Sequence, residues 1–260
     1  MTISEMRERK QELGYSYLQI AELSGIPVGT VQKVLGGITA SPRYDTLLAL
    51  EKVLSPKRPS IVCDVAYDYL AKRQGEYTVE DYYKIPDEQR VELIDGWIYD
   101  MAAPTSVHQI IIAFLTAKLF SYIADNQGKC MVLQSPIDVQ LNCDNKTMVQ
   151  PDIIVVCNRD KIIDRCIYGA PDLIIEVLSP SSKRRDTIIK LHKYMDAGVR
   201  EYWLIDPDKR KIVIHNFEQD DYAIYGFESI IPVSIWEEDC MIDFNEISKQ
   251  IQFLYEKKGD

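Results

Sequence analysis

From residue 91 onward the sequence is a succession of short apolar segments of strand length, interrupted by two segments with a helical pattern. VELIDGWIYDM at 91–101 predicts a hairpin, because Asp95-Gly96 suits the two-residue turn between its strands. The other predicted elements are strands at 130–134, 136–141, 148–157, 171–180 and 201–206, a long apolar helix at 105–124 and a charged helix at 184–197. This order of elements predicts an α/β (α+β) domain in which a mixed sheet is flanked by helices.

The first sixty residues have a different pattern, which is typical of a small all-α domain. Helices are predicted at 2–13 and 42–54, on either side of YLQIAELSGIPVGTVQKVLGG at 17–37. In this central segment Gly25 suits a turn with a positive φ angle, and Pro27 suits the first turn of the following helix. Gly36-Gly37 is expected to end that helix. The segment therefore predicts two helices joined by a tight turn.

This pattern resembles the helix-turn-helix of the lambda-repressor/Cro-like family over about residues 1–56. The match includes the spacing of Ala21 and Gly25 and the later apolar anchors Val31 and Val34. The resemblance implies that residues 28–35 enter the major groove of DNA. The side chains expected to face the DNA are Val28, Thr30, Gln32 and Lys33, with Gln32 reading adenine and Arg43 contacting a phosphate. A helical module that serves dimerisation or partner binding is the alternative.

The distribution of charge separates the two parts of the chain. The net charge of the whole chain is −10, but residues 1–58 carry a balance of +2 and the remaining residues a balance of −12. We therefore predict a helix-turn-helix domain at 1–58, a helical linker at 59–75 and a second domain at 76–260. The acidic balance predicts weak, salt-sensitive binding to non-specific duplex.

Three carboxylates interrupt apolar strands of the second domain. Glu92 lies within VELI, Asp152 follows Pro151 in VQPDIIVV, and Glu176 ends LIIE. An ionised carboxylate beside an apolar core is costly unless something compensates it, and a divalent cation is one such compensation. A magnesium ion held by carboxylates activates water and neutralises phosphate charge, so the pattern predicts phosphodiester hydrolysis with Mg²⁺ or Mn²⁺.

A lysine is expected to accompany these acids. Asp186, Lys190 and Tyr194 are spaced i, i+4, i+8 in the helix after Glu176, so they lie near one face. Lys190 is therefore the candidate to reach the attacking water or the scissile phosphate. Lys193 lies off that face and is the weaker candidate.

The same segments closely resemble the Uma-two family of restriction endonucleases over about residues 76–255. The resemblance is carried by VELIDG, Ser106-Val-His108, QPDIIVV, PDLIIEVLSPSS, RDTIIKLHKY and GVREYWLIDP. It implies a PD-(D/E)XK restriction-endonuclease-like fold, metal binding by Glu92, Asp152 and Glu176, and Lys190 as the catalytic cation. One position departs from the superfamily pattern, since Leu178 stands where a lysine usually follows the second acid.

Each of these residues also has a structural alternative. Glu92 could pair with a neighbouring arginine such as Arg90, and Asp152 could be a turn residue. Glu176 could pair with a buried arginine, while Lys190 could be a solvated helix residue. For His108, at the head of the long helix, a capping or hydrogen-bonding role is favoured over that of an accessory base.

Six scattered cysteines show no C-x-x-C pair, so we expect neither a disulfide framework nor a structural zinc. The first residues carry charges where a signal peptide needs an apolar stretch, and no apolar run approaches roughly 18 residues. We therefore expect the protein to be located in the cytoplasm and not to associate with a membrane.

The leading hypothesis is an endodeoxyribonuclease that its helix-turn-helix brings to DNA. A sequence-specific regulator whose inactive nuclease-like domain serves dimerisation is the second hypothesis, and a nuclease for RNA or branched DNA is the third. Double-strand cutting and palindromic recognition would both favour a homodimer with two-fold symmetry.

Overall fold

The structure is a computed structural model that describes residues 3–13, 15–37, 39, 42, 44–54, 72–86, 88–180 and 182–256. The chain divides into two compact units, residues 1–64 and 65–260, and each unit is described by itself. Residues 59–71 of the predicted linker lie outside the described residues, and so does Arg43.

The first unit contains four helices, α1 (Ile3–Glu12), α2 (Tyr17–Ser24), α3 (Val28–Leu35) and α4 (Tyr44–Leu54). The side-chain oxygen of Ser16 accepts a hydrogen bond from the backbone N–H of Gln19 and caps the start of α2. Gly25 adopts a left-handed conformation with a φ of +70°, as the sequence predicts. The core of this unit consists of Met6, Ile20, Ala21, Val31, Val34, Leu35, Leu50 and Leu54.

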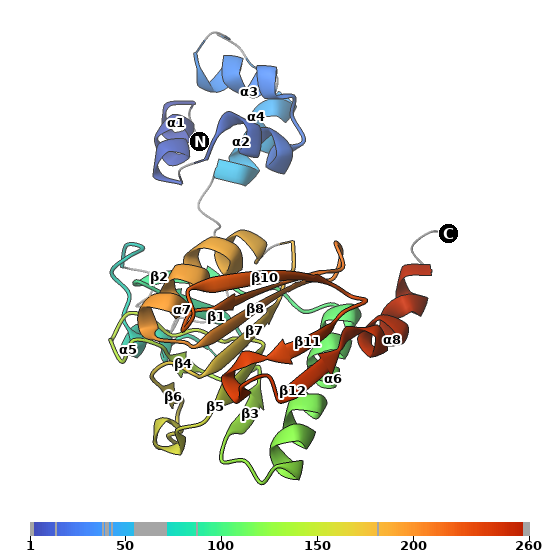
Figure 1. Ribbon diagram of the computed structural model, residues 1–260. Helices are drawn as coiled ribbons and strands as arrows, with labels where there is room; N and C mark the ends of the chain where they lie inside the picture. Colours follow the sequence, from blue (N-terminus) through green and yellow to red (C-terminus); the bar gives the residue numbers. More distant parts are fainter. Residues whose placement is uncertain are drawn as a thin grey trace. The chain divides into compact units, whose positions relative to one another are not determined.

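The second unit is built on a mixed sheet of six strands in the order β10-β9-β8-β7-β5-β3. Only β7 and β8 are parallel, and the other neighbours are antiparallel. The strands of this sheet are β3 (Met131–Gln134), β5 (Ile153–Val156), β7 (Leu173–Val177), β8 (Glu201–Asp206), β9 (Lys211–Asn216) and β10 (Asp221–Gly226). Figure 1 shows this sheet as the centre of the unit.

Smaller elements surround the six-stranded sheet. The additional strands are β1 (Val91–Ile94), β2 (Trp97–Asp100), β4 (Val139–Gln140), β6 (Ile167–Tyr168), β11 (Ile230–Val233) and β12 (Cys240–Asp243). The helices are α5 (Val79–Tyr82), α6 (Ser106–Asp125), α7 (Leu191–Ala197) and α8 (Phe244–Glu256). Short 3-10 turns lie at Arg159–Lys161 and Ser234–Trp236, and a π-helical segment, Arg185–Lys190, runs directly into α7.

The central strands are buried on both faces. Every residue of β5, β7 and β8 is buried, because α6 and α8 cover one face of the sheet and α7 covers the other (Figure 1). Ile153, Ile175 and Trp203 point into the first of these cores. Ile154, Ile174 and Tyr202 point into the second, where Tyr194 of α7 meets them. The two faces therefore alternate along each strand.

Helix α6 bears on the expectation that no apolar segment is long enough to cross a membrane. By length and composition alone it is apolar enough to cross a membrane, although only 28% of its most apolar stretch is buried. Its residues Ile111, Leu115 and Leu119 nevertheless pack into the core against the sheet, with α8 beside it. An apolar helix that buries one face in this way has the role of a core helix.

The observed elements are shorter than the predicted ones in several places. The predicted strand 136–141 contains only the two residues of β4, and the predicted strand 148–157 is regular only over β5. Proline accounts for part of this, since neither Pro136 nor Pro151 has an N–H group that could donate a ladder hydrogen bond. The predicted charged helix 184–197 begins with the π-helical segment. Within the described residues, α8 and the strands after Asp206 had no counterpart in the prediction.

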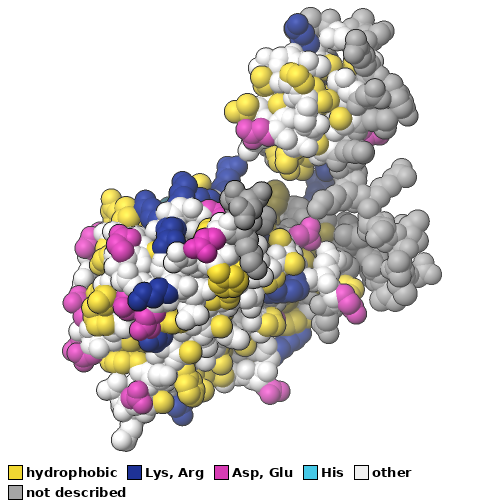
Figure 2. Space-filling model, turned by 90° about the vertical axis from the view of Figure 1, so that its right-hand side faces the viewer, with side chains coloured by type: hydrophobic (Ala, Val, Ile, Leu, Met, Phe, Trp, Pro, Cys, Tyr) yellow, Lys and Arg dark blue, Asp and Glu magenta, His cyan; other side chains and the backbone are white. Residues whose placement is uncertain are grey.

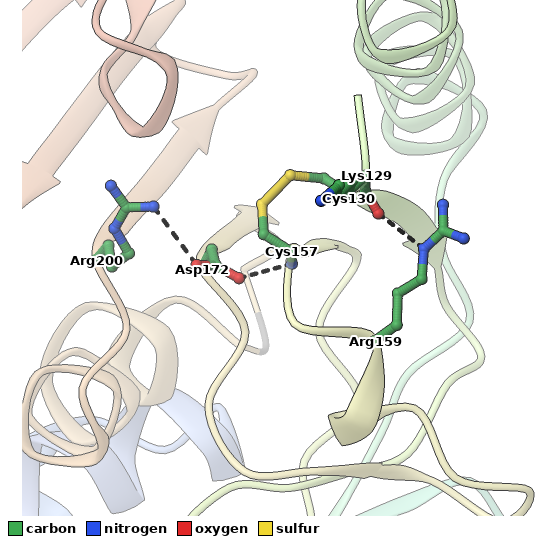
Figure 3. Close-up of a disulfide and its surroundings, with 6 residues drawn as sticks. All are labelled: Lys129, Cys130, Cys157, Arg159, Asp172 and Arg200. Atoms are coloured by element: carbon green, nitrogen blue, oxygen red, sulfur yellow. Dashed lines mark hydrogen bonds and ion pairs between the residues drawn. A yellow bond between two sulfur atoms is a disulfide. The ribbon is translucent and has the colours of Figure 1, made fainter. Parts of the chain in front are cut away.

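The expectation about disulfides is wrong at one position. Cys130 and Cys157 form a disulfide between the start of β3 and the end of β5 (Figure 3). The pairing of Met131 with Val156 places these two cysteines directly opposite one another in the next step of the ladder. The backbone N–H of Cys157 also donates a hydrogen bond of 2.8 Å to Asp172. Cys166 and Cys240 are buried free thiols, Cys143 is exposed, and Cys63 lies outside the described residues.

Candidate functional site

Two of the predicted acids lie side by side in the sheet, Glu176 within β7 and Asp152 immediately before β5. The antiparallel register of β5 and β7 pairs Ile153 with Ile175, which places Asp152 opposite Glu176 at the next step. Cross-strand neighbours point to the same face of a sheet. The backbone N–H of Val177 donates a hydrogen bond of 2.8 Å to Oδ2 of Asp152 and holds this carboxylate against β7. The sheet thus brings together residues that are distant in the sequence.

Lys190 lies at the centre of a buried cluster of acids. Its Nζ atom is 2.6 Å from Oε1 of Glu92, 2.9 Å from Oε1 of Glu176 and 3.5 Å from Oδ1 of Asp186. Only 3% of the lysine side chain is exposed. The hydroxyl group of Tyr194 donates a second hydrogen bond, of 2.9 Å, to Oε1 of Glu176. The predicted common face of Asp186, Lys190 and Tyr194 is therefore present, although the segment begins as a π-helix.

Burial and mutual repulsion shift the titration of this cluster. Burial raises the pKa of Glu176 well above its ordinary value; Lys190 opposes this shift, and the nearby acids Asp186, Asp152 and Glu92 reinforce it. Burial by itself would lower the pKa of Lys190, but Glu176, Glu92 and Asp186 raise it well above the ordinary value. The ammonium form of Lys190 is therefore strongly favoured, and three acids share its positive charge.

Glu92 is fully buried, and its carboxylate faces two cations. Oε1 contacts Lys190 and accepts a hydrogen bond of 3.0 Å from the backbone N–H of Gln150. Oε2 lies 3.3 Å from Nε of Arg185, yet neither atom makes a hydrogen bond of good geometry within the described residues. The arginine partner of Glu92 is thus Arg185, whereas the sequence alternative named Arg90. This geometry suits a residue that fixes Lys190 and Arg185 in place.

His108 contacts the other acid. It lies in the first turn of α6, where the side chain of Thr105 accepts a hydrogen bond from its backbone N–H. Its Nε2 atom lies 3.1 Å from Oδ2 of Asp152, and its Nδ1 atom is buried without a hydrogen-bond partner in the described chain. The side chain of His108 thus orients Asp152, a role close to the hydrogen-bonding alternative.

These residues line a cavity of about 800 Å³ within the second unit. Its polar side is formed by Glu92, Asp152, Glu176, Asp186 and Lys190. A more apolar side is formed by residues 101–107, which lead into the first turn of α6, and by Leu178 and Tyr255. A cavity of this size has room for a nucleotide segment next to the acids.

The carboxylates suit a divalent cation with few protein ligands. Among the described residues, no group of three or more His, Cys, Asp and Glu side chains is arranged as a metal site. Asp152 Oδ1 and Glu176 Oε2, however, accept no hydrogen bond from any described residue, and both residues line the cavity. Two carboxylates with free oxygens fit Mg²⁺, which usually keeps several water ligands. The assignment of Glu92 as a third ligand remains a prediction.

Two members of the cluster, Asp186 and Arg185, were not predicted as site residues. Asp186 was predicted only to share a helical face with Lys190 and Tyr194. Burial raises the pKa of Asp186, opposed by Lys190. An acid four residues before a candidate lysine on the same helical face is a signal that could have identified Asp186 as part of the site.

In the first unit, the predicted recognition residues lie on α3. Val28, Gln32 and Lys33 are exposed, and Thr30 is half-buried. Val31, Val34 and Leu35 are buried on the opposite side of the helix. The helix therefore presents a polar face that is available for a ligand, as a helix-turn-helix requires.

One face of the second unit carries side chains of both signs of charge. In the view of Figure 2, basic and acidic side chains of the described residues are interspersed with hydrophobic ones. A mixed surface of this kind adds little to non-specific attraction for a polyanion.

The architecture of the second unit is that of a nuclease-like fold. It is similar to the crystal structure of a protein from Anabaena variabilis described as "a putative nuclease belonging to DUF820", with a TM-score of 0.55 and 22% sequence identity over 65% of this chain and 96% of that one. Residues 79–235, more than half of the chain, match the Uma2 family, described as "Putative restriction endonuclease". The chain belongs to this family.

Two further similarities complete the comparison. Residues 6–58 match a helix-turn-helix family, so the chain combines a helix-turn-helix DNA-binding domain with its nuclease-family domain. The chain is also 28% identical over 156 residues to the uncharacterized protein slr1290 of Synechocystis sp., which covers 58% of this chain and 80% of that protein. These findings confirm the family and the fold that the sequence predicted.

Proposed function

We propose that this protein is a divalent-metal-dependent endodeoxyribonuclease that its helix-turn-helix domain directs to DNA. The observation that carries the proposal is the placement of Asp152 opposite Glu176, with Lys190 2.9 Å from Glu176. Two acids at the ends of neighbouring strands and a lysine from the following helix are groups that suit metal-assisted phosphodiester hydrolysis.

In this proposal Asp152 and Glu176 hold the cation, Mg²⁺ or Mn²⁺. When bound, such an ion lowers the pKa of a water molecule and neutralises charge on the phosphate. Lys190 keeps its proton and positions the attacking water or stabilises the charge that develops on the phosphate. Glu92 completes the site or orients Lys190, and His108 orients the carboxylate of Asp152.

The test is cleavage of plasmid DNA by the purified protein with Mn²⁺ or Mg²⁺. We expect the wild type to nick the plasmid and the Asp152→Ala, Glu176→Ala double variant to be inactive. Asp172→Ala is the matched control, because Asp172 also follows a proline and also accepts a backbone N–H hydrogen bond, of 2.8 Å, elsewhere in the sheet. Equal nicking by wild type and double variant would refute the assignment.

A second candidate function is a regulator that binds DNA without cutting it. Two observations favour it. Glu92 and Glu176 form ion pairs with Lys190, so a cation already neutralises part of their charge. In addition, the described side chains contain no three-ligand metal site. Calorimetric titration with Mn²⁺ separates the two candidates. Saturable heat that the double variant lacks supports the nuclease, whereas operator binding with no metal binding supports the regulator.

Both candidates include a homodimer. Two copies related by a two-fold axis would present two α3 helices to the half-sites of a palindrome. Light scattering on the purified protein measures the state directly, and a monomer at all concentrations, with and without DNA, would contradict this part of the proposal.

A further inference from the structure

Arg90 lies at the edge of the cavity, immediately before β1. Its backbone carbonyl accepts a hydrogen bond of 3.0 Å from the N–H of Met101, which fixes it at the base of the β1–β2 hairpin. Its side chain is exposed and lines the cavity together with Ser135 and Gln150. The guanidinium group is therefore held at the entrance and remains accessible from the solvent.

Neutral groups hold this guanidinium group. Its NH2 atom donates hydrogen bonds of 3.0 Å to Oγ of Ser135 and of 3.3 Å to Oε1 of Gln150. Among the described residues, no carboxylate forms an ion pair with Arg90. The other cations that line the cavity differ in this respect, since Arg185 and Lys190 both contact the buried carboxylate of Glu92. The charge of Arg90 is thus available to a ligand.

Gln150 is itself fixed in the orientation that supports Arg90. Its Nε2 atom donates hydrogen bonds of 2.9 Å to the hydroxyl of Tyr82 and of 2.9 Å to Oδ1 of Asp138. With both amide hydrogens in use, Oε1 is left to accept from Arg90. The backbone N–H of the same residue contacts Glu92, so a short chain of hydrogen bonds joins Arg90 to the acid cluster.

The cavity has an excess of negative charge. It is lined by five acids, Glu92, Asp152, Glu176, Asp186 and Asp208, but by only three cations, Arg90, Arg185 and Lys190. A phosphodiester strand that enters would be repelled by the uncompensated acids. An arginine with unused N–H donors attracts a phosphate and binds two of its oxygens through its planar fork.

We propose that Arg90 is the anchor of a phosphate-binding subsite at the entrance of the cavity, which holds a phosphate group of the nucleic-acid strand next to the scissile bond. Ser135 and Gln150 keep the fork in position for this contact. The inference rests on the proposed nuclease function and adds a substrate-positioning residue that does not touch the acids directly.

The test uses deoxythymidine 3′,5′-bisphosphate, which carries two phosphate groups but is too short for a helix-turn-helix to recognise. Its affinity for the full chain is measured by calorimetry with Ca²⁺ present. We expect Arg90→Gln to weaken binding about tenfold to one hundredfold, the effect of losing a hydrogen bond to a charged group. Arg90→Lys keeps the charge without the fork and should fall between wild type and Arg90→Gln.

Arg159→Gln is the matched control, since Arg159 is also exposed and its Nε atom donates a 2.8 Å hydrogen bond to the carbonyl of Lys129, away from the cavity. This variant should bind as the wild type does. Equal affinity of wild type and Arg90→Gln, or no binding by the folded wild type, would overturn the inference. Plasmid nicking by the wild type is measured in a separate experiment. Whether the wild type nicks the plasmid therefore tests the nuclease proposal independently of the binding measurement.

Discussion

Replacing Lys190 by methionine should destabilise the second unit strongly. The substitution keeps most of the side-chain volume and removes the one ammonium group that Glu92, Glu176 and Asp186 share. At a separation of 2.9 Å and an effective dielectric constant of about 20, each close pair attracts with about 6 kcal/mol before desolvation is subtracted. Removing one partner of a buried ion pair costs about 3–5 kcal/mol in measured cases, because it leaves uncompensated charge.

The loss should grow as the pH rises. Glu176 already has a pKa raised well above its ordinary value by burial, an effect that Lys190 opposes. Between the pKa of Glu176 in the unfolded chain and its higher pKa in the folded protein, the folded state binds more protons than the unfolded state. The stability of the folded state therefore decreases as the pH rises through this interval. Without Lys190 the pKa of folded Glu176 rises further, so this interval extends to higher pH. The variant should consequently lose more stability than the wild type as the pH rises above the pKa that Glu176 has in the folded wild type.

Urea unfolding followed by tryptophan fluorescence measures this effect without interference from the first unit, since Trp97, Trp203 and Trp236 all belong to the second. The measurement is made in EDTA. The control is Lys193→Met, on the same helix, because Lys193 pairs with the half-exposed Asp95 and such pairs contribute less than about 1 kcal/mol. Equal stability of the two variants, or a loss for Lys190→Met that does not depend on pH, would refute the reasoning.

Two further predictions concern other parts of the chain. Gln32→Ala should lower discrimination at one base pair of the preferred DNA sequence by about 1–3 kcal/mol, which selection from random duplexes measures; an unchanged preference at every position would contradict the role of Gln32. The disulfide closes a loop with a sequence separation of 27, so its reduction should lower stability by about 3–4 kcal/mol. A reducing agent should therefore lower the unfolding midpoint of the wild type and leave that of the Cys130→Ser, Cys157→Ser variant unchanged; no effect on the wild type would show that the two thiols are not bonded.

Much of this architecture could be predicted because local signals and tertiary packing agree. The run IIVV of β5, the run LIIEV of β7 and the turn Asp95-Gly96 each identify an element without knowledge of its neighbours. The acids Asp152 and Glu176 stand out for the same reason, since one directly precedes an apolar strand and the other interrupts one. Their adjacency follows from strand order and register, which the sequence does not state but the family resemblance implies.

The parts that were not predicted depend on contacts between distant segments. The disulfide joins cysteines that only the pairing of β3 with β5 brings together. The arginine partner of Glu92 is Arg185, a residue 93 positions away in the sequence, whereas the structural alternative considered for Glu92 named the near neighbour Arg90. The π-helical segment likewise has no distinct sequence pattern, because its residues RDTIIK would also suit an α-helix.

The ladder between β5 and β7 has a consequence for how this chain can change over evolution. Side chains of a strand alternate between faces, so a displacement of β5 by an odd number of residues would move Asp152 away from Glu176 and turn Ile153 toward the lysine. Insertions in the connection at 157–172 avoid this, because they leave the ladder in place. Homologous chains should therefore vary in the length of that connection outside β6, which pairs with β4, while odd-numbered gaps inside either strand should be absent from members that cut DNA.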